Sequence, residues 1–280
     1  MKLKITHETT YRFNSEVFLE PHSFRLKPRA MPYLNPDTYT LDISPKPAGL
    51  QEHADAEGNA VSICWFEGMH LEMNIAASSV VVINDYNPFG FLVYPPDFLK
   101  LPFVYAGAEG RQLRTALAGQ RTAEDVHAYC LKIRKESENA TIPFLANLTR
   151  QIHKDFKVLT RETGPPHQPG RTFRQRHGSC RDLAWMQVHM LRSLGIASRF
   201  VSGYCYLQDA ETDHELHAWS EAYLPGAGWM GMDPSHGIIT GNTYIPLASS
   251  IHYDNAMPVS GTIRGKARSV LAANLSIEQV

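Results

Sequence analysis

The sequence predicts an α+β protein, in which an N-terminal antiparallel β-sandwich or barrel precedes helices packed on a second antiparallel sheet. Three observations predict this class. Strand-like segments fill the first hundred residues, apolar residues at helical spacing dominate 122–194, and strand-like segments return between 198 and 233. We therefore expect two domains, a β-rich domain at 1–105 and a second domain at 106–280.

The N-terminal domain is predicted from alternating apolar and polar residues and from turn residues. Residues 2–13, 37–45 and 70–84 have the pattern of strands. QEHAD at 51–55 and NAVSICWF at 59–66 are separated by a turn-like AEGN, which predicts a hairpin. Prolines fall between these segments or at their ends, as strand chemistry requires. Short strands joined by turns favour a sandwich or barrel.

Three helices are predicted in the second domain, after a connector at 106–120. Thr122 is expected to cap the first helix, and Thr141 to start the second. The third helix is expected to begin at Cys180 or one residue later and to stop at Gly195. Strand-like segments then follow at 198–207, 217–224 and 228–233, with PGAG as a turn between the last two.

Composition indicates a soluble globular chain. The 280 residues are 43% hydrophobic and 20% charged, with a formal net charge of −1, so a nucleic-acid partner is not expected. We find no run of 18 apolar residues and no apolar leader in MKLKITHETTYRF, so we expect no membrane association. We expect a cytoplasmic protein, with its oligomeric state left open.

The four cysteines are widely spaced and contain no C-x-x-C, so neither a zinc ribbon nor a disulfide scaffold is indicated. The sequence places them at Cys64, Cys130, Cys180 and Cys205. In a reducing cytosol they would remain free thiols. We predict no cofactor and no structural metal.

Cys180 is the candidate nucleophile, because it stands where the third helix is expected to begin. The unpaired N–H groups and the positive end of the helix dipole favour thiolate over thiol and can bind a developing oxyanion. The small residues Gly178 and Ser179 are expected to leave the approach to the sulfur open. By contrast, Cys130 lies within an apolar stripe, as a buried structural cysteine does.

A thiolate nucleophile needs a base, and the base needs an orienting group. His217 begins one predicted strand and Asp233 ends the next, just before Pro234. If the two strands form a hairpin, antiparallel pairing makes His217 and Asp233 neighbours. Each of these three residues considered alone has a more common structural explanation. Their convergence on one place favours a catalytic triad.

Two stretches carry a family resemblance. GSCRDLAWMQVHMLRSLGIASRFVSGY and HAWSEAYLPGAGWMGMDPSHG resemble the transglutaminase-like superfamily of cysteine enzymes, with G-x-C, H-A-W and D-P in the family order. MKLKITHETTYRF resembles the β-rich region that precedes this core in bacterial transglutaminase-like proteins. The resemblance implies a papain-like or transglutaminase-like catalytic core at 106–280. Arg181 departs from the family, in which many members have glutamine after the cysteine, and is expected to alter the mouth of the site.

The resemblance implies a role for each residue of the triad. Cys180 would attack a peptide or carboxamide carbonyl to form a thioester, His217 would transfer protons, and Asp233 would orient the imidazole. Water would then give hydrolysis, as in a protease or amidase, and an amine would give transamidation. The implied partner is a peptide or protein substrate. The alternative is a catalytically silent scaffold that binds a partner protein. Trp219 is expected to pack beside His217 and shield it from water.

Other signals are weaker. GAGWMG at 226–231 matches a nucleotide-binding pattern but forms a turn and a strand rather than opening a helix. HELH does not have the zincin spacing, no G-x-S-x-G occurs, and no calcium loop appears. A zinc site formed by Cys180, His214, His217 and His236 remains conceivable. His177, His189 and His236 are otherwise expected to be solvated or structural.

Overall fold

The computed structural model describes residues 1–118, 123–161, 163–206 and 216–280. The N-terminal region forms two antiparallel sheets that face each other, which confirms the predicted sandwich. One sheet contains β15 (Ile263–Arg264), β1 (Lys2–Leu19), β6 (His70–Ile83), β3 (Leu34–Ser44) and β16 (Ser269–Gln279). The other contains β14 (Val259–Ser260), β2 (His22–Phe24), β5 (Ala60–Trp65) and β4 (Gly49–Ala54).

Alternation along the long strands explains the sandwich. In β1, Leu3 and Ile5 are buried while their neighbours face outward, and the same pattern runs along β6. The buried side chains of both sheets join one apolar cluster, which includes Leu3, Ile5, Phe24 and Cys64. The predicted hairpin is also confirmed, because Gly49 pairs with Trp65 and Ala54 with Ala60 across the intervening turn.

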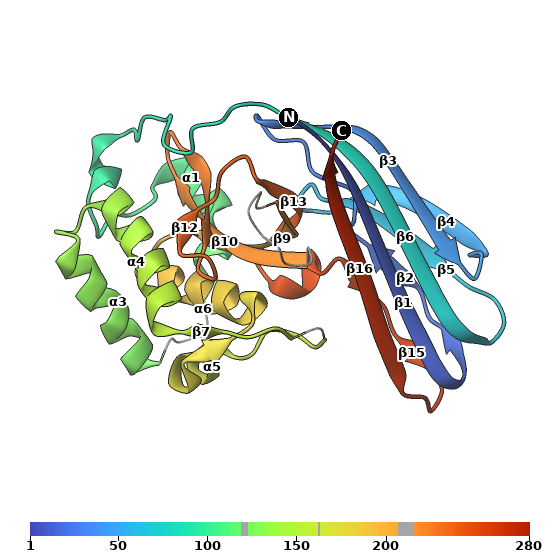
Figure 1. Ribbon diagram of the computed structural model, residues 1–280. Helices are drawn as coiled ribbons and strands as arrows, with labels where there is room; N and C mark the ends of the chain where they lie inside the picture. Colours follow the sequence, from blue (N-terminus) through green and yellow to red (C-terminus); the bar gives the residue numbers. More distant parts are fainter. Residues whose placement is uncertain (119–122, 162, 207–215) are drawn as a thin grey trace.

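The chain returns to this sandwich at its C-terminal end. β16 pairs antiparallel with β1 along its length, from Leu3↔Gln279 to Phe13↔Ser269. Figure 1 shows β16 beside β1, with the two chain termini close together. The division between residues 105 and 106 remains a prediction, and the last strand on its C-terminal side lies in the N-terminal sheet.

The second region is built on a five-stranded antiparallel sheet with helices against it. The strand order is β12 (Ile238–Ile239), β11 (Gly228–Asp233), β10 (Leu216–Leu224), β9 (Ser198–Cys205) and β13 (Tyr244–Ser250). The helices are α1 (Gly107–Gln112), α2 (Arg114–Leu117), α3 (Glu124–Glu136), α4 (Thr141–Asp155), α5 (Pro169–Gln175) and α6 (Cys180–Ser193). The remaining elements are η1 (Pro96–Leu99), β7 (Lys157–Val158), β8 (His177–Gly178) and η2 (Tyr253–Ala256).

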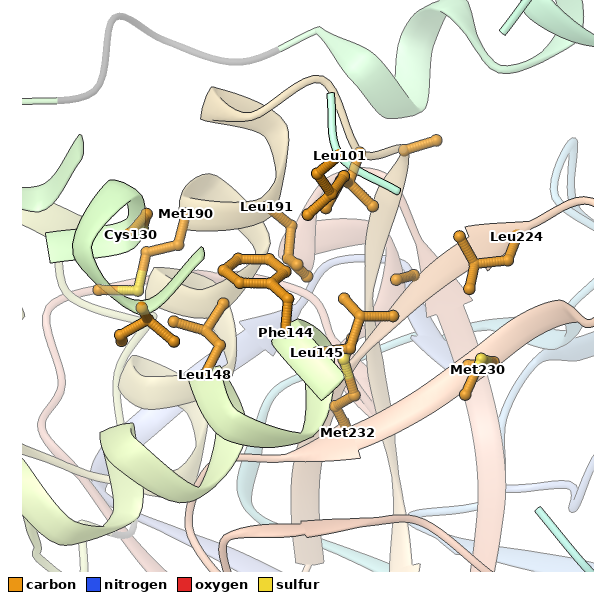
Figure 2. Packing of buried hydrophobic residues seen from close by; sticks show 14 of the residues in the cluster. Leu101, Cys130, Phe144, Leu145, Leu148, Met190, Leu191, Leu224, Met230 and Met232 are labelled. Atoms are coloured by element: carbon orange, nitrogen blue, oxygen red, sulfur yellow. The ribbon is translucent and has the colours of Figure 1, made fainter. Parts of the chain in front are cut away.

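The core of this region lies between α4, α6 and the sheet. Figure 2 shows Phe144, Leu145 and Leu148 of α4 facing Leu191 of α6, with Met232 of β11 on the sheet side. All five side chains are fully buried. Burial of each such side chain favours folding by about 1.5 to 3 kcal/mol, so this core fixes α6 against the sheet that carries the candidate site.

The second and third predicted helices are confirmed, as α4 and α6, and Gly195 follows α6 with φ 76°, where glycine is favoured. The first is also present as α3, but Thr122 lies outside the described residues. The expected connector differs in detail, because residues 107–117 form the short helices α1 and α2.

The two regions share apolar contacts. The apolar cluster of the sandwich includes three buried residues from the sheet of the second region, Tyr204, Ile245 and Leu247. The hydroxyl of Tyr204 also lies 3.0 Å from Nδ1 of His7 on β1. The sandwich therefore supports the back of β9 and β13. Within residues 1–118, 123–161, 163–206 and 216–280, no helix combines the length and apolar character needed to cross a membrane.

Candidate active site

Cys180 is the first residue of α6 because its neighbours cap the helix. Ser179 is the N-cap and forms a capping box with Asp182, whose Oδ2 accepts the Ser179 N–H at 2.8 Å. The first N–H groups of a helix have no partner within it and carry the positive end of the dipole. The half-buried Cys180 therefore stands where a thiolate is stabilised, at the helix start predicted from the sequence.

The segment before the cysteine is more enclosed than the sequence suggested. A Cβ atom on Gly178 would lie 2.7 Å from Cβ of Asp182 and 3.2 Å from Cγ2 of Thr172. Ser179 is 3% exposed and serves the helix cap. These small residues therefore allow close packing under the helix start. Their role is structural, and they do not keep an approach open.

Asp182 joins the start of α6 to the preceding loop. Its Oδ1 lies 2.7 Å from Nη2 of Arg161 and accepts the backbone N–H of His167 at 2.6 Å. Burial opposes ionisation of Asp182, but hydrogen bonds from His167 and Ser179 and the charge of Arg161 outweigh it, so its pKa lies below the ordinary value. This ion pair was not predicted from the sequence.

Arg181 binds the same loop. Its guanidinium donates hydrogen bonds to the carbonyl oxygen of Gly164 at 3.0 Å and to that of Arg161. The side chain therefore holds the chain beside the helix start in place. Its positive charge also favours the Cys180 thiolate.

His217 and Asp233 meet at one end of a hairpin. β10 and β11 pair from Leu224↔Gly228 to Ser220↔Met232, so the start of β10 and the end of β11 are neighbours. His217 Nε2 lies 2.6 Å from Asp233 Oδ2. The predicted hairpin and the predicted meeting of these two residues are therefore both present.

Cys180 and His217 are neighbours, and each shifts the pKa of the other. Since Nε2 of His217 faces Asp233, Nδ1 is the nitrogen available to the sulfur. Burial disfavours the thiolate, but the proximity and charge of His217 outweigh burial, so the pKa of Cys180 lies below its ordinary value. Burial also opposes protonation of His217, yet Asp233 and Cys180 together raise its pKa well above 6.5. The arrangement favours a thiolate–imidazolium pair.

The Asp233 carboxylate is completely buried and accepts many hydrogen bonds. Oδ1 accepts the N–H groups of Ser235 at 2.8 Å and His236 at 3.3 Å. Oδ2 accepts the Tyr244 hydroxyl at 2.7 Å and lies 2.6 Å from Nδ1 of His236. Burial opposes its charge, but His217 and His236 together hold its pKa well below the ordinary value.

Sequence reasoning missed Tyr244, and it named His236 only as a ligand of the zinc alternative. Tyr244 lies on β13, which is separated from the strand of Asp233 by β10 and β9, and nothing local in the sequence indicates that contact. His236 was expected to be solvated or structural, but its imidazole contacts the candidate carboxylate. The only signal was its position three residues after Asp233, which sequence alone does not distinguish from a turn residue.

Trp219 packs where it was expected. Its ring is 2% exposed, and its centroid lies 6.5 Å from that of His217 at an interplanar angle of 27°. Tyr244 closes the other side, with centroids 5.3 Å apart. Trp219 also fits because Gly203 faces it, since a Cβ there would lie 2.6 Å from the indole. The tryptophan therefore lies beside the histidine, as expected from the sequence.

Two histidines of the zinc alternative, His217 and His236, face the Asp233 carboxylate. His214 lies outside the described residues. His217 Nε2 and His236 Nδ1 each lie 2.6 Å from the same oxygen of Asp233. These separations fit N–H donors shared by one acceptor, and a cation between them would have to displace both protons. The donor set is therefore that of a hydrogen-bonded cluster.

Comparison with known proteins agrees with this architecture. Residues 3–82 match the bacterial transglutaminase-like N-terminal region, and residues 127–234 match the transglutaminase-like superfamily. An uncharacterized protein of Mycobacterium tuberculosis is 23% identical over 275 residues, covering 94% of this chain and 87% of the relative. A protein-glutamine gamma-glutamyltransferase of Pseudomonas aeruginosa is 30% identical over 105 residues, covering 33% of this chain and 15% of that protein.

A solved structure shares the fold over the whole chain. It is a candidate cysteine protease from Cytophaga hutchinsonii, with a TM-score of 0.74 and 18% identity, covering 100% of this chain and 91% of that chain. The two family matches fall on the sandwich and on the segment that carries Cys180, His217 and Asp233. The chain therefore belongs to the transglutaminase-like superfamily and joins a bacterial transglutaminase-like N-terminal region to a transglutaminase-like core.

Proposed function

We propose that the protein catalyses thiol-dependent acyl transfer on peptide or carboxamide bonds, with Cys180 as nucleophile, His217 as proton-transfer group and Asp233 as its orienting carboxylate. One observation carries the proposal. A thiol at a helix start lies beside an imidazole that lowers its pKa, and Nε2 of that imidazole lies 2.6 Å from a buried carboxylate. This is the arrangement that an activated nucleophile requires.

The reaction begins with the Cys180 thiolate and the His217 imidazolium. The sulfur forms a bond to the substrate carbonyl carbon, and the oxygen takes the negative charge beside the N–H of Cys180. The C–N bond then breaks, His217 gives its proton to the leaving amine, and a thioester remains. Water or a second amine loses a proton to His217 and attacks the thioester, which returns the sulfur as thiolate beside the imidazolium.

The choice between water and amine decides the product. Transamidation has support from the Pseudomonas aeruginosa relative, which is a protein-glutamine gamma-glutamyltransferase. Hydrolysis uses the same acyl-enzyme and differs only in the acceptor. We take a peptide or protein as the substrate in both cases. We propose no cofactor and no nucleic-acid or membrane partner, and we propose the cytoplasm as location because a reducing compartment keeps the thiol free.

A substrate survey tests the proposal. The protein is incubated with peptides containing carboxamide side chains, with and without a primary amine, and mass spectrometry searches for an acyl adduct on Cys180. We expect a thioester on Cys180 and a product that is either deamidated, cleaved or linked to the amine. Cys180→Ala should remove adduct and product, whereas Cys64→Ala, a change at a buried thiol of the sandwich, should retain both.

The scaffold alternative predicts a different result. A silent core would give no adduct, and iodoacetamide would label Cys180 at pH 6 no faster than an unstructured thiol. Fast labelling at pH 6 that disappears on denaturation supports the enzyme. Product formation that survives Cys180→Ala would disprove the mechanism.

A further inference from the structure

The Asp233 carboxylate contacts two imidazoles, those of His217 and His236. His236 follows β11 in a tight turn, and its Nδ1 lies 2.6 Å from the Oδ2 atom that also faces His217. The two imidazole rings stack, with centroids 4.8 Å apart and an interplanar angle of 21°. A triad requires one imidazole on its carboxylate, so the second one calls for a physical explanation.

His236 is held in this position by its surroundings. Its Nδ1 lies 3.2 Å from the Tyr244 hydroxyl, which itself donates to Asp233, and Cys205 is a further neighbour that favours its protonated form. The titratable groups that face it are thus Asp233 on β11, His217 on β10, Tyr244 on β13 and Cys205 on β9. The side chain is 35% exposed, so one edge of the ring reaches solvent while the other is fixed.

The charges of the cluster make His236 more than a packing residue. Interactions with Asp233 and Cys205 outweigh burial and the repulsion of His217, and they raise the pKa of His236 to about 9. At neutral pH, His236 is therefore a cation. The charges of the cluster then cancel, which favours burial of its members together. The negative groups are the Cys180 thiolate and the Asp233 carboxylate, and the positive groups are the imidazolium ions of His217 and His236.

We propose that His236 is a positioning residue of the acyl-transfer site, which orients the Asp233 carboxylate and shares its negative charge with His217. The role rests on the proposed function, since it acts through the cysteine–histidine pair. It has two consequences. Without the His236 hydrogen bond, the carboxylate loses one of the donors that fix Oδ2. Without the positive charge of His236, the full negative charge of Asp233 acts on His217, and the pKa of His217 rises.

The pH dependence of Cys180 alkylation tests both consequences. The rate rises in two steps, at low pH when the thiolate forms beside the imidazolium and at high pH when His217 loses its proton. Iodoacetamide labelling is followed on the tryptic peptide of residues 177–181, in which Cys180 is the cysteine. His236→Asn keeps an N–H close to the Nδ1 position but removes the charge. We expect its upper step to move up by about one pH unit, with the plateau rate retained.

His236→Ala removes the donor as well as the charge. We expect a plateau rate several-fold below that of His236→Asn, because Asp233 then orients His217 less well. If His236→Ala fails to fold, His236→Gln replaces it, since its amide lies one bond further out than Nδ1. His252→Asn is the matched control, because His252 is paired with Asp254 at 3.3 Å and should keep the wild-type profile.

The results separate this role from the proposed function. Either of two results overturns the role of His236. In one, the upper step of His236→Asn occurs at the wild-type pH. In the other, the variant without the donor reaches the plateau rate of wild type. In both cases His217→Ala would still label far more slowly than wild type at pH 6. If the proposed function fails instead, His217→Ala labels as fast as wild type.

Discussion

His217 Nε2 and Asp233 Oδ2 lie 2.6 Å apart although each stands at a different end of its strand. Antiparallel pairing of β10 with β11 brings the two ends together, and α6 brings Cys180 to the same place. The site therefore depends on one local hairpin and on one helix packed against it.

Asp233→Asn is expected to reduce the alkylation rate of Cys180 at pH 6 by about a hundredfold, toward the rate of an ordinary thiol. The amide has no negative charge, so it no longer stabilises the imidazolium, and the Cys180 thiolate loses its partner. The rate is measured by mass spectrometry, with circular dichroism to show that the fold is retained. Asp254→Asn, a change at an exposed carboxylate, is the control. A variant that labels at the wild-type rate would contradict the role of Asp233.

Asp182→Ala is expected to lower the free energy of unfolding by about 2 kcal/mol at pH 7, because it leaves Arg161 without its buried partner and removes part of the helix cap. The folded-state pKa of Asp182 is below its ordinary value of 3.8. Its contribution is therefore complete above pH 3.8 and is lost as the pH falls from there toward the folded-state pKa.

Urea unfolding at pH 7 and at pH 3 measures this effect. The difference between wild type and Asp182→Ala should be smaller at pH 3, where the wild type has lost part of the contribution. Asp37→Ala provides the comparison, because Asp37 forms a half-exposed ion pair with Lys2 at 2.9 Å and should change stability little. An Asp182→Ala effect that is equal at both pH values would show that charge is not its cause.

Gly203→Ala is expected to destabilise the protein by about 2 kcal/mol or more. The added Cβ would lie 2.3 Å from the carbonyl oxygen of Ile245 and 2.6 Å from the Trp219 ring. The clash with Ile245 is with backbone, so either β9 and β13 separate or Trp219 moves away from His217. Thermal unfolding gives the stability. Gly241→Ala, where no atom lies within 4 Å of the new Cβ, should keep the wild-type melting temperature.

The elements that could be predicted from sequence are those set by local interactions. The capping residues and Gly195 mark the ends of α6, and the PGAG turn determines the register of β10 and β11, so Cys180, His217 and Asp233 could be placed before the structure was known. Family resemblance added the assignment of roles. Local patterns and one resemblance were therefore enough for the core of the site.

The parts that could not be predicted depend on pairing between distant segments. β13 joins the sheet through β9, which lies about forty residues earlier in the chain, and this pairing brings Tyr244 to Asp233. The short and partly apolar sequence of β13 is compatible with several structures. His236 was underestimated for a related reason, because its contact with Asp233 depends on the conformation of the turn at 233–237 rather than on its composition.

Ile277→Ala tests the C-terminal strand of the sandwich. Ile277 is 5% exposed and pairs with Ile5 on β1, although more than 270 residues separate them in sequence. If β16 is an integral part of the sheet, removing this buried side chain should destabilise the protein by about 2 to 4 kcal/mol. Val270→Ala is the matched control, because Val270 is on the same strand and 70% exposed. Chemical unfolding followed by fluorescence measures both variants. Equal stability of the two would mean that the Ile277 side chain contributes no more to the sandwich than an exposed side chain of the same strand.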